Sequence, residues 1–411
     1  MKRKLLAIAV CMMLFVAGFE GLRADGGLGP WNHRTNPAFF AFGNREIFEL
    51  GVSTSMGIGN SALGLSDVFS RVVVIDLDEV YADTPNDGLR VGASAEAELH
   101  LALQFGKLGF GLYTDAYDLS RTVIPRTFIG LLTQGNEPNQ SYSSSAEILQ
   151  RAFAQAGMFA SYQIGGFVFA GKIGAFSPML YSDENAEAGF MLETASDGTF
   201  RGEVFASGDI YTAIGEDGLQ GLGFNVSLGL VRPDEEGNPR YGAGLNNIPL
   251  VAAKPGYVIE VEQLRYEFEA TDLLDRLERG EEPFTTASQI GDVQTRPLDP
   301  SDQPKIHMPF SVSGFYRFAV PVVDIVPDAE VVFDNPVRLN AGLVVEGNIF
   351  PANLFSVGFG RRDYLWYATA GFRIPLRVFE LALQVASVGT VPRGIFDASG
   401  LGATLSLALG Y

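Results

Sequence analysis

Few residues of this chain have catalytic potential. The histidines are His33, His100 and His307, and the single cysteine, Cys11, lies near the amino terminus. A histidine, an acid and a serine occur together by chance in any chain of 411 residues, so their presence predicts no triad. The sequence has no Gly-x-Ser-x-Gly elbow, no His-Glu-x-x-His helix and no phosphate-binding loop. We therefore expect no catalytic residues, no cofactor and no enzyme activity.

Three acidic runs could bind a cation: Asp183-Glu184, Asp234 to Glu236 and Glu278 to Glu282. Their spacing is not that of an EF-hand loop, and isolated acidic loops are usually only solvated. The sequence thus predicts no metal site. An excess of carboxylates inside a water-filled pore would instead favour the passage of cations.

Aromatic side chains outside any strand pattern are candidates for binding a hydrophobic ligand. They are Phe39, Phe40, Phe128 and Phe153. Such residues can line an apolar pocket. They can equally pack a plug and loops against a surrounding wall, and the sequence leaves both interpretations open.

The composition favours strands over long helices. The chain has 48 glycines, 31 phenylalanines and 14 tyrosines, and only 19% of its residues are charged. Its formal net charge of −19 argues against nucleic acid, because binding phosphates requires clustered Lys and Arg. A polypeptide of this length can form a single large barrel.

The amino terminus predicts an exported protein. Lys2, Arg3 and Lys4 precede an apolar stretch from Leu5 to Ala17, and a signal peptide over residues 1–24 is expected. Cys11 would leave with it. After residue 24 no window of about 18 apolar residues follows, so no spanning helix is expected. The remaining way to cross a bilayer is a closed β-barrel.

The carboxyl-terminal segment shows the alternation expected of a barrel strand. One face is apolar and the other is small or polar, with Leu401, Ala403, Leu405, Leu407, Leu409 and Tyr411 opposite Gly402, Thr404, Ser406, Ala408 and Gly410. The terminal aromatic, Tyr411, resembles the last-strand signal that the outer-membrane barrel assembly machinery recognises. A soluble β-sandwich would show the same alternation with the faces exchanged.

The same alternation recurs along the chain and predicts about 14 to 16 strands. The predicted ranges are 47–58, 95–105, 108–117, 156–164, 166–176, 201–214, 220–232, 239–248, 257–268, 308–318, 339–348, 353–361, 364–374, 378–388 and 400–411. Residues 72–77 are either another strand or part of an inserted loop. Short turns, such as Gly106-Lys107 and Gly165-Gly166, alternate with long polar connections, as in an outer-membrane barrel.

Three stretches do not show the strand pattern. Residues 25–45 are glycine-rich and contain Asn36-Pro37-Ala38. Residues 119–155 suggest a short helix from Ser145, with Ile148, Leu149 and Phe153 spaced for one face. Residues 269–306 are rich in acids and prolines, with a candidate helical turn after Thr271. The last two stretches are either outer loops or material folded into the lumen, and loops of this length are often functional.

The order of these features resembles the FadL-like outer-membrane group of long-chain fatty-acid transporters and related barrels such as PorV. The similarity consists of a signal peptide, a glycine-rich segment, Asn36-Pro37-Ala38, a β-rich chain with an aromatic end, and a glycine- and asparagine-containing strand over residues 240–248. The resemblance implies an all-β transmembrane antiparallel barrel of fourteen strands over residues 46–411. It also implies a hatch over residues 25–45 that includes Asn36, Pro37 and Ala38.

The resemblance further implies passive uptake of hydrophobic, fatty-acid-like molecules past the hatch, in the outer membrane of a diderm bacterium. The expected partners are outer-membrane lipids, a hydrophobic small-molecule ligand and the assembly machinery. Two alternatives stay open. One is a general diffusion porin with cation preference, and the other is a non-transporting structural or secretion-associated barrel.

Overall fold

The structure, a computed structural model, describes most of the chain after residue 31. The described ranges are 32–42, 47–64, 77–134, 139–182, 186–196, 199–215, 218–270, 286–350, 353–376 and 378–410. The predicted signal peptide, the range 72–76, the turn after Thr271 and Tyr411 lie outside them.

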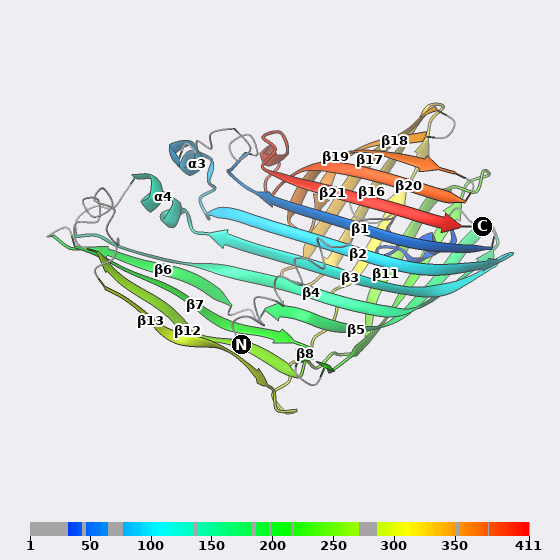
Figure 1. Ribbon diagram of the computed structural model, residues 1–411. Helices are drawn as coiled ribbons and strands as arrows, with labels where there is room; N and C mark the ends of the chain where they lie inside the picture. Colours follow the sequence, from blue (N-terminus) through cyan, green and yellow to red (C-terminus); the bar gives the residue numbers. More distant parts are fainter. Residues whose placement is uncertain are drawn as a thin grey trace.

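Antiparallel strands form one closed wall (Figure 1). Neighbouring strands of this wall are, in order, β1 (Phe48–Asn60), β2 (Leu89–Phe105), β3 (Leu108–Ile124), β4 (Ser141–Ile164), β5 (Phe167–Ser182), β10 (Gly223–Pro233), β11 (Pro239–Val251), β14 (Phe310–Tyr316), β16 (Val323–Phe333), β17 (Arg338–Phe350), β18 (Asn353–Arg362), β19 (Leu365–Pro375), β20 (Phe379–Gly389) and β21 (Gly400–Gly410). β21 pairs with β1 from Glu49↔Gly410 to Gly59↔Gly400, which closes the wall. The two-residue β15 (Phe318–Ala319) also pairs with β16.

Two more strands are inserted between β4 and β5. β6 (Glu187–Thr194) pairs with β4 over residues 141–147, and β7 (Phe200–Thr212) pairs with β6 and with the last two residues of β5. The closed antiparallel barrel therefore has 16 strands, whereas about fourteen were expected. The reason is the length of β4, whose 24 residues extend beyond its pairing with β5. Backbone groups of that extension need another partner, and β6 provides it.

The sheet continues past β7 as a side extension. β12 (Tyr257–Ala270) pairs with β7, and β13 (Thr286–Pro297) pairs with β12 (Figure 1). β8 (Ile214–Gly215) and β9 (Gly218–Leu219) form a separate two-stranded ribbon. β11 pairs directly with β14, so the β12–β13 hairpin is no part of the closed wall.

The two ends of the barrel differ. Tight turns at Gly106-Lys107 and Gly165-Gly166 mark one end, called the short-turn end here. The opposite, long-loop end carries α3 (Leu77–Asp83), α4 (Arg126–Gln134) and η2 (Arg393–Ile395). A further short helix, η1 (Pro37–Ala41), precedes β1.

No helix within the described ranges combines the length and the apolar character needed to cross a membrane.

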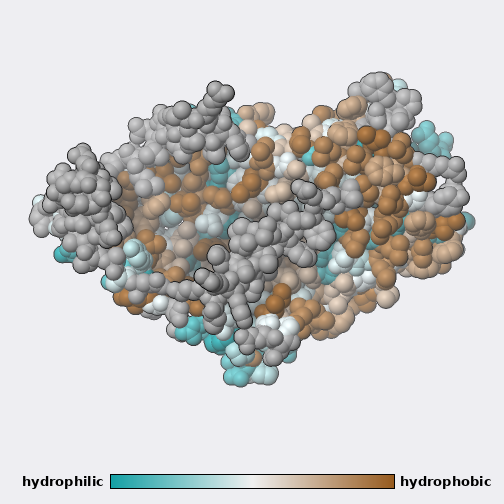
Figure 2. Space-filling view, in the orientation of Figure 1, coloured by the Kyte–Doolittle hydropathy of each residue, from teal (hydrophilic) through white to brown (hydrophobic). Residues whose placement is uncertain are grey.

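The strands have opposite faces of different exposure. In β21 buried and more exposed residues alternate, with Leu401 and Leu409 on the exposed face and Thr404 and Ser406 on the buried one. Large apolar side chains on other strands are also exposed, and Figure 2 shows apolar residues gathered over the barrel strands. Examples are Leu50, Ile58, Leu112, Met158, Ile173, Leu228, Leu343, Val357 and Val385. The outer surface is thus apolar, while many inward side chains are polar.

All fifteen ranges predicted as strands fall on strands, but two expectations were wrong. The helix from Ser145 does not form, because residues 141–164 are the strand β4. Arg151, Ala152 and Phe153 are buried in succession where the register with β5 shifts, so the strand does not alternate simply. Residues 269–306 contain β13, which the sequence analysis missed. The predicted strands also omitted β6 and β16.

Candidate functional site

Residues 32–42, called the interior segment here, form the candidate functional site. The backbone carbonyl of Asn32 accepts hydrogen bonds from the Thr35 and Asn36 amides, at 3.0 and 3.1 Å, which makes a tight turn. Asn36 then caps η1, because its Oδ1 accepts the Ala38 amide at 3.0 Å. Pro37 occupies the first helical turn, where its missing N–H costs nothing. Asn36-Pro37-Ala38 is therefore a helix start.

One side of the interior segment is hydrogen-bonded to β10, β11 and β14. Asn36 Nδ2 donates to the Leu230 carbonyl at 3.3 Å. The Thr35 carbonyl accepts from Asn246 Nδ2 at 2.6 Å and from Ser313 Oγ at 2.5 Å. These bonds join the segment to three adjacent strands of the wall.

Charged contacts hold the segment to the opposite part of the wall. Arg34 Nη2 lies 3.0 Å from Glu96 Oε1 of β2 and 3.5 Å from Asp363 Oδ2, in the turn between β18 and β19. The Arg34 guanidinium also lies over the ring of Tyr117 on β3, at 4.3 Å from its centroid. The segment therefore has partners on strands at opposite parts of the closed wall. It can contact both only if it lies inside the barrel.

Asp363 is the centre of this charged network. The carboxylate is buried and is also hydrogen-bonded to Arg338 of β17. Burial alone would raise the pKa of Asp363, but Arg338, Arg34 and Arg362 outweigh it and hold the pKa below its ordinary value. Asp363 is therefore an ionised anchor for Arg34.

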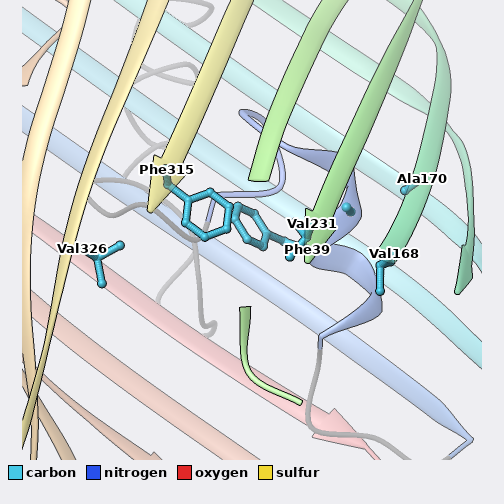
Figure 3. Packing of buried hydrophobic residues seen from close by; sticks show 7 residues of the cluster. Phe39, Val168, Ala170, Val231, Phe315 and Val326 are labelled. Atoms are coloured by element: carbon cyan, nitrogen blue, oxygen red, sulfur yellow. The ribbon is translucent and has the colours of Figure 1, made fainter. Parts of the chain in front are cut away.

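Aromatic rings fix the next part of the segment. Phe40 stacks on Phe159 of β4, with centroids 3.9 Å apart, and on His33, with centroids 4.1 Å apart. Phe39 points in another direction and packs against Phe315, Val231 and their neighbours (Figure 3). The two adjacent phenylalanines thus pack against different strands of the barrel.

Only two of the four predicted ligand-binding phenylalanines come together. Phe39 and Phe40 belong to the interior segment and are buried. Phe153 lies on β4, in another buried cluster with Phe176 and Leu119. Phe128 lies on α4, with its ring 5.0 Å from that of Phe190. The four residues do not form one pocket.

The cluster around Phe153, called the outer cluster here, is apolar. It contains Tyr117, Leu119, Phe153, Phe176, Ala253, Ile306 and Met308. Ala253 and Ile306 form an isolated β-bridge between the segments that follow β11 and precede β14. These segments therefore pack against side chains on β3, β4 and β5 towards the long-loop end.

A small, partly open cavity of about 10 Å³ lies beside the interior segment. It is lined by Thr35, Asn36, Phe39, Ser313, Phe315, Asp328, Glu330 and Arg362, among others. Most of these groups are polar or charged. At this size the cavity can hold about one water molecule and is too small for a hydrophobic solute.

Sequence reasoning missed His33 and Arg34 as functional residues. Their partners on β2, Glu96 and Glu98, lie more than 60 positions away, so spacing along the chain gives no signal. The ring of His100 is hydrogen-bonded to Glu98 and Glu49. The predicted glycine- and asparagine-containing strand, residues 240–248, also takes part through Asn246.

Comparisons with known proteins found similar chains among solved structures only. No protein-family model and no curated protein matches the sequence. Among solved structures, the chain is similar to the Pseudomonas putida toluene transporter TodX, with 12% identity and a TM-score of 0.47 over 95% of this chain and 96% of that one. It is also similar to the Ralstonia pickettii toluene transporter TbuX, with 11% identity and a TM-score of 0.44 over 93% and 98%.

A Pseudomonas aeruginosa FadL homologue is similar as well, with 11% identity and a TM-score of 0.39 over 91% of both chains. These neighbours include the group that the sequence resembles. At identities and TM-scores this low, the ligands and mechanisms of these neighbours cannot be assigned to this chain.

Proposed function

We propose that this protein is an outer-membrane barrel through which hydrophobic small molecules pass passively, and that the interior segment is its hatch. The observation that carries the proposal is the position of residues 32–42. Their contacts reach β2, β4, β10, β11, β14 and the β18–β19 turn, so they cross the lumen. A segment bound on both sides of the wall obstructs ion flow.

The outer cluster supports a hydrophobic cargo. A lumen that conducts hydrophilic solutes is polar and water-filled. Here buried Leu119, Phe153 and Phe176 are grouped towards the long-loop end, above the interior segment. Such a surface can accept an apolar solute before it meets the hatch. Fatty-acid-like molecules are one class with this chemistry.

The exposed apolar side chains on the outer face of the strands, called the apolar belt here, support a membrane location. Soluble monomers rarely expose large contiguous apolar patches, because each apolar Å² left in water costs about 25 cal/mol. Side chains such as Leu112, Met158 and Val357 are more than half exposed on the strands. Export through a signal peptide over residues 1–24 and recognition of the terminal aromatic Tyr411 by the barrel assembly machinery belong to the same proposal.

Planar-bilayer conductance tests the hatch. Three refolded proteins are compared: residues 25–411, the same chain without residues 25–45, and a control without residues 25–31 only. We expect the first and third to be silent and the second to conduct. Stable cation-selective channels in the intact protein would replace the proposal with a diffusion porin. Silence of all three would favour a non-transporting barrel.

Dye entry tests the cargo. Cells that carry the protein in their outer membrane are mixed with the hydrophobic fluorophore N-phenyl-1-naphthylamine. Faster dye entry than in cells without the protein is expected. A Phe176→Asp variant, which places a charge in the outer cluster, should lose this increase while retaining its surface level. Equal dye entry with and without the protein contradicts a hydrophobic cargo.

A further inference from the structure

Two histidines and a glutamate meet where the interior segment contacts β2. His33 Nδ1 lies 2.8 Å from Glu98 Oε1, and His100 Nδ1 lies 3.0 Å from the same oxygen. One ligand atom from each of the three residues lies within 4.8 Å of the other two. His33 comes from the segment, whereas Glu98 and His100 are two positions apart on the same face of β2.

We propose that His33, Glu98 and His100 bind one divalent transition-metal ion of the zinc class. Zinc in proteins takes imidazole nitrogens and carboxylate oxygens at about 2.0–2.2 Å. Tetrahedral coordination at that length separates ligand atoms by about 3.3 Å. The separations of 2.8 and 3.0 Å are within a few tenths of an ångström of this value. The third separation, between the two histidine nitrogens, lies within 4.8 Å, so side-chain rotations must bring it to the tetrahedral value to admit an ion.

The environment of His100 supports a metal ligand. Its second ring nitrogen, Nε2, lies 3.1 Å from Glu49 Oε1 of β1, and both side chains are buried. Without an ion, both ring nitrogens of His100 face carboxylates, so a metal ion would displace the Nδ1 proton. The hydrogen bond from Nε2–H to Glu49 then keeps the remaining proton on Nε2 and leaves Nδ1 as the electron-pair donor. Metal-bound histidines commonly have this carboxylate partner.

The His33 ring is also held in place. It stacks on Phe40 with centroids 4.1 Å apart and an interplanar angle of 17°, and it meets His100 edge-on at 5.0 Å. Only 6% of His33 is exposed. A ring fixed in this way loses little freedom when it binds an ion, which favours binding.

Charge balance and donor type select the ion. Glu98 and Glu49 carry two negative charges, which a divalent cation neutralises while both imidazoles stay neutral. Magnesium and calcium prefer six or more oxygen ligands, whereas two imidazoles and one carboxylate suit zinc, nickel or copper. Three protein ligands leave a fourth position for water. The proposal adds a site that the sequence did not predict and does not depend on the cargo.

Zinc titration tests the site. Untagged refolded protein, residues 25–411, is stripped with a chelator and titrated with zinc sulfate against a chromophoric competitor. We expect one ion per chain. His33→Ala and Glu98→Gln should each lower the affinity at least tenfold, and Glu49→Gln should lower it 10- to 100-fold. The control is His307→Ala, which removes the exposed third histidine and should leave the affinity unchanged.

Heat-dependent migration on a denaturing gel establishes that each variant forms the barrel. As a second measurement, bound Co²⁺ should give the intense visible absorption of a tetrahedral site in the wild type and lose it in His33→Ala. The proposal is overturned if the wild type binds no zinc, if His33→Ala binds it equally well, or if His307→Ala abolishes binding.

Discussion

Two glycines of the wall allow the interior segment to approach it closely. A Cβ atom at Gly244 of β11 would lie 2.1 Å from the Thr35 carbonyl oxygen, and one at Gly229 of β10 would lie 2.2 Å from Asn36 Oδ1. Real Cβ atoms are not found at such distances, so a side chain here must displace the segment. We expect Gly244→Ala to open the channel part of the time, measured as single-channel conductance.

A matched glycine controls this test. A Cβ atom at Gly171 of β5 meets no atom nearer than 3.8 Å, which is ordinary van der Waals contact. Gly171→Ala should therefore remain as silent as the wild type. Equal conductance from both variants would show that the channel does not open because the Thr35 contact is lost. That result would argue against the hatch.

The lowered pKa of Asp363 predicts an acid-dependent loss of stability. A carboxyl whose folded-state pKa lies below its unfolded value of about 3.9 stabilises the fold above that pH. This contribution disappears as the pH falls through the lowered pKa. Asp363→Asn should cost about 3–5 kcal/mol of unfolding free energy at pH 7, because Arg338 loses a buried partner.

Urea unfolding between pH 7 and pH 3 checks this expectation. The difference between wild type and Asp363→Asn should be largest above pH 5 and shrink towards pH 3. Asp397→Asn removes a more exposed carboxylate paired with Arg393 and should cost about 0–1 kcal/mol. A difference for Asp363→Asn that is independent of pH would show that ionisation of this carboxyl is not the cause.

At the scale of elements, alternation predicted most strands of the barrel and failed where a strand is irregular. The hairpin from β2 to β3 was predicted with its turn at Gly106-Lys107. The outer part of β4 was not, because Arg151, Ala152 and Phe153 are buried in succession and the register with β5 shifts there, which breaks the period-2 pattern. Whether such a segment becomes a strand depends on its pairing with strands that are distant in the sequence. The local spacing of apolar residues does not reveal that pairing.

The candidate site was predictable only in part for the same reason. Asn36-Pro37-Ala38 was singled out by the family resemblance, and Phe39 and Phe40 because they lie outside any strand pattern; all five belong to the interior segment. Arg34 and Asp363 meet only because the chain closes into a barrel. No property of either residue's neighbours in the sequence identifies the other.

The β12–β13 hairpin should be removable without loss of the barrel. Among the strands that the structure describes, the hairpin pairs outside itself only with β7, whereas β11 pairs directly with β14. Ile259 and Thr295 face each other, so an Asn-Gly turn can replace residues 260–294. The shortened protein should keep its heat-dependent gel migration. Deleting residues 310–316 interrupts the wall at β14 and should abolish that migration. Failure of both deletions would make the hairpin essential to folding.

For the whole molecule, the closed wall and the apolar belt imply the same environment. Because β1 pairs with β21, the backbone N–H and C=O groups at the edges of the first and last strands are hydrogen-bonded. A hydrocarbon phase requires this pairing, since it offers these groups no other partners. The polar groups are collected inside, on the interior segment and its partners. A protein in water would instead have polar groups outside and apolar ones inside. The cost of a new charge on the outer face therefore distinguishes a membrane from water.

A lysine placed in the belt measures that environment. Leu228 lies at the middle of β10 and is 47% exposed, whereas Val322, in the turn before β16, is 72% exposed. In phosphatidylcholine vesicles, Leu228→Lys should lower the free energy of unfolding by about 2–4 kcal/mol, and Val322→Lys by about 0–1 kcal/mol. Urea unfolding followed by tryptophan fluorescence provides both values. Equal small losses would place Leu228 in water, because only hydrocarbon penalises the charge by its depth.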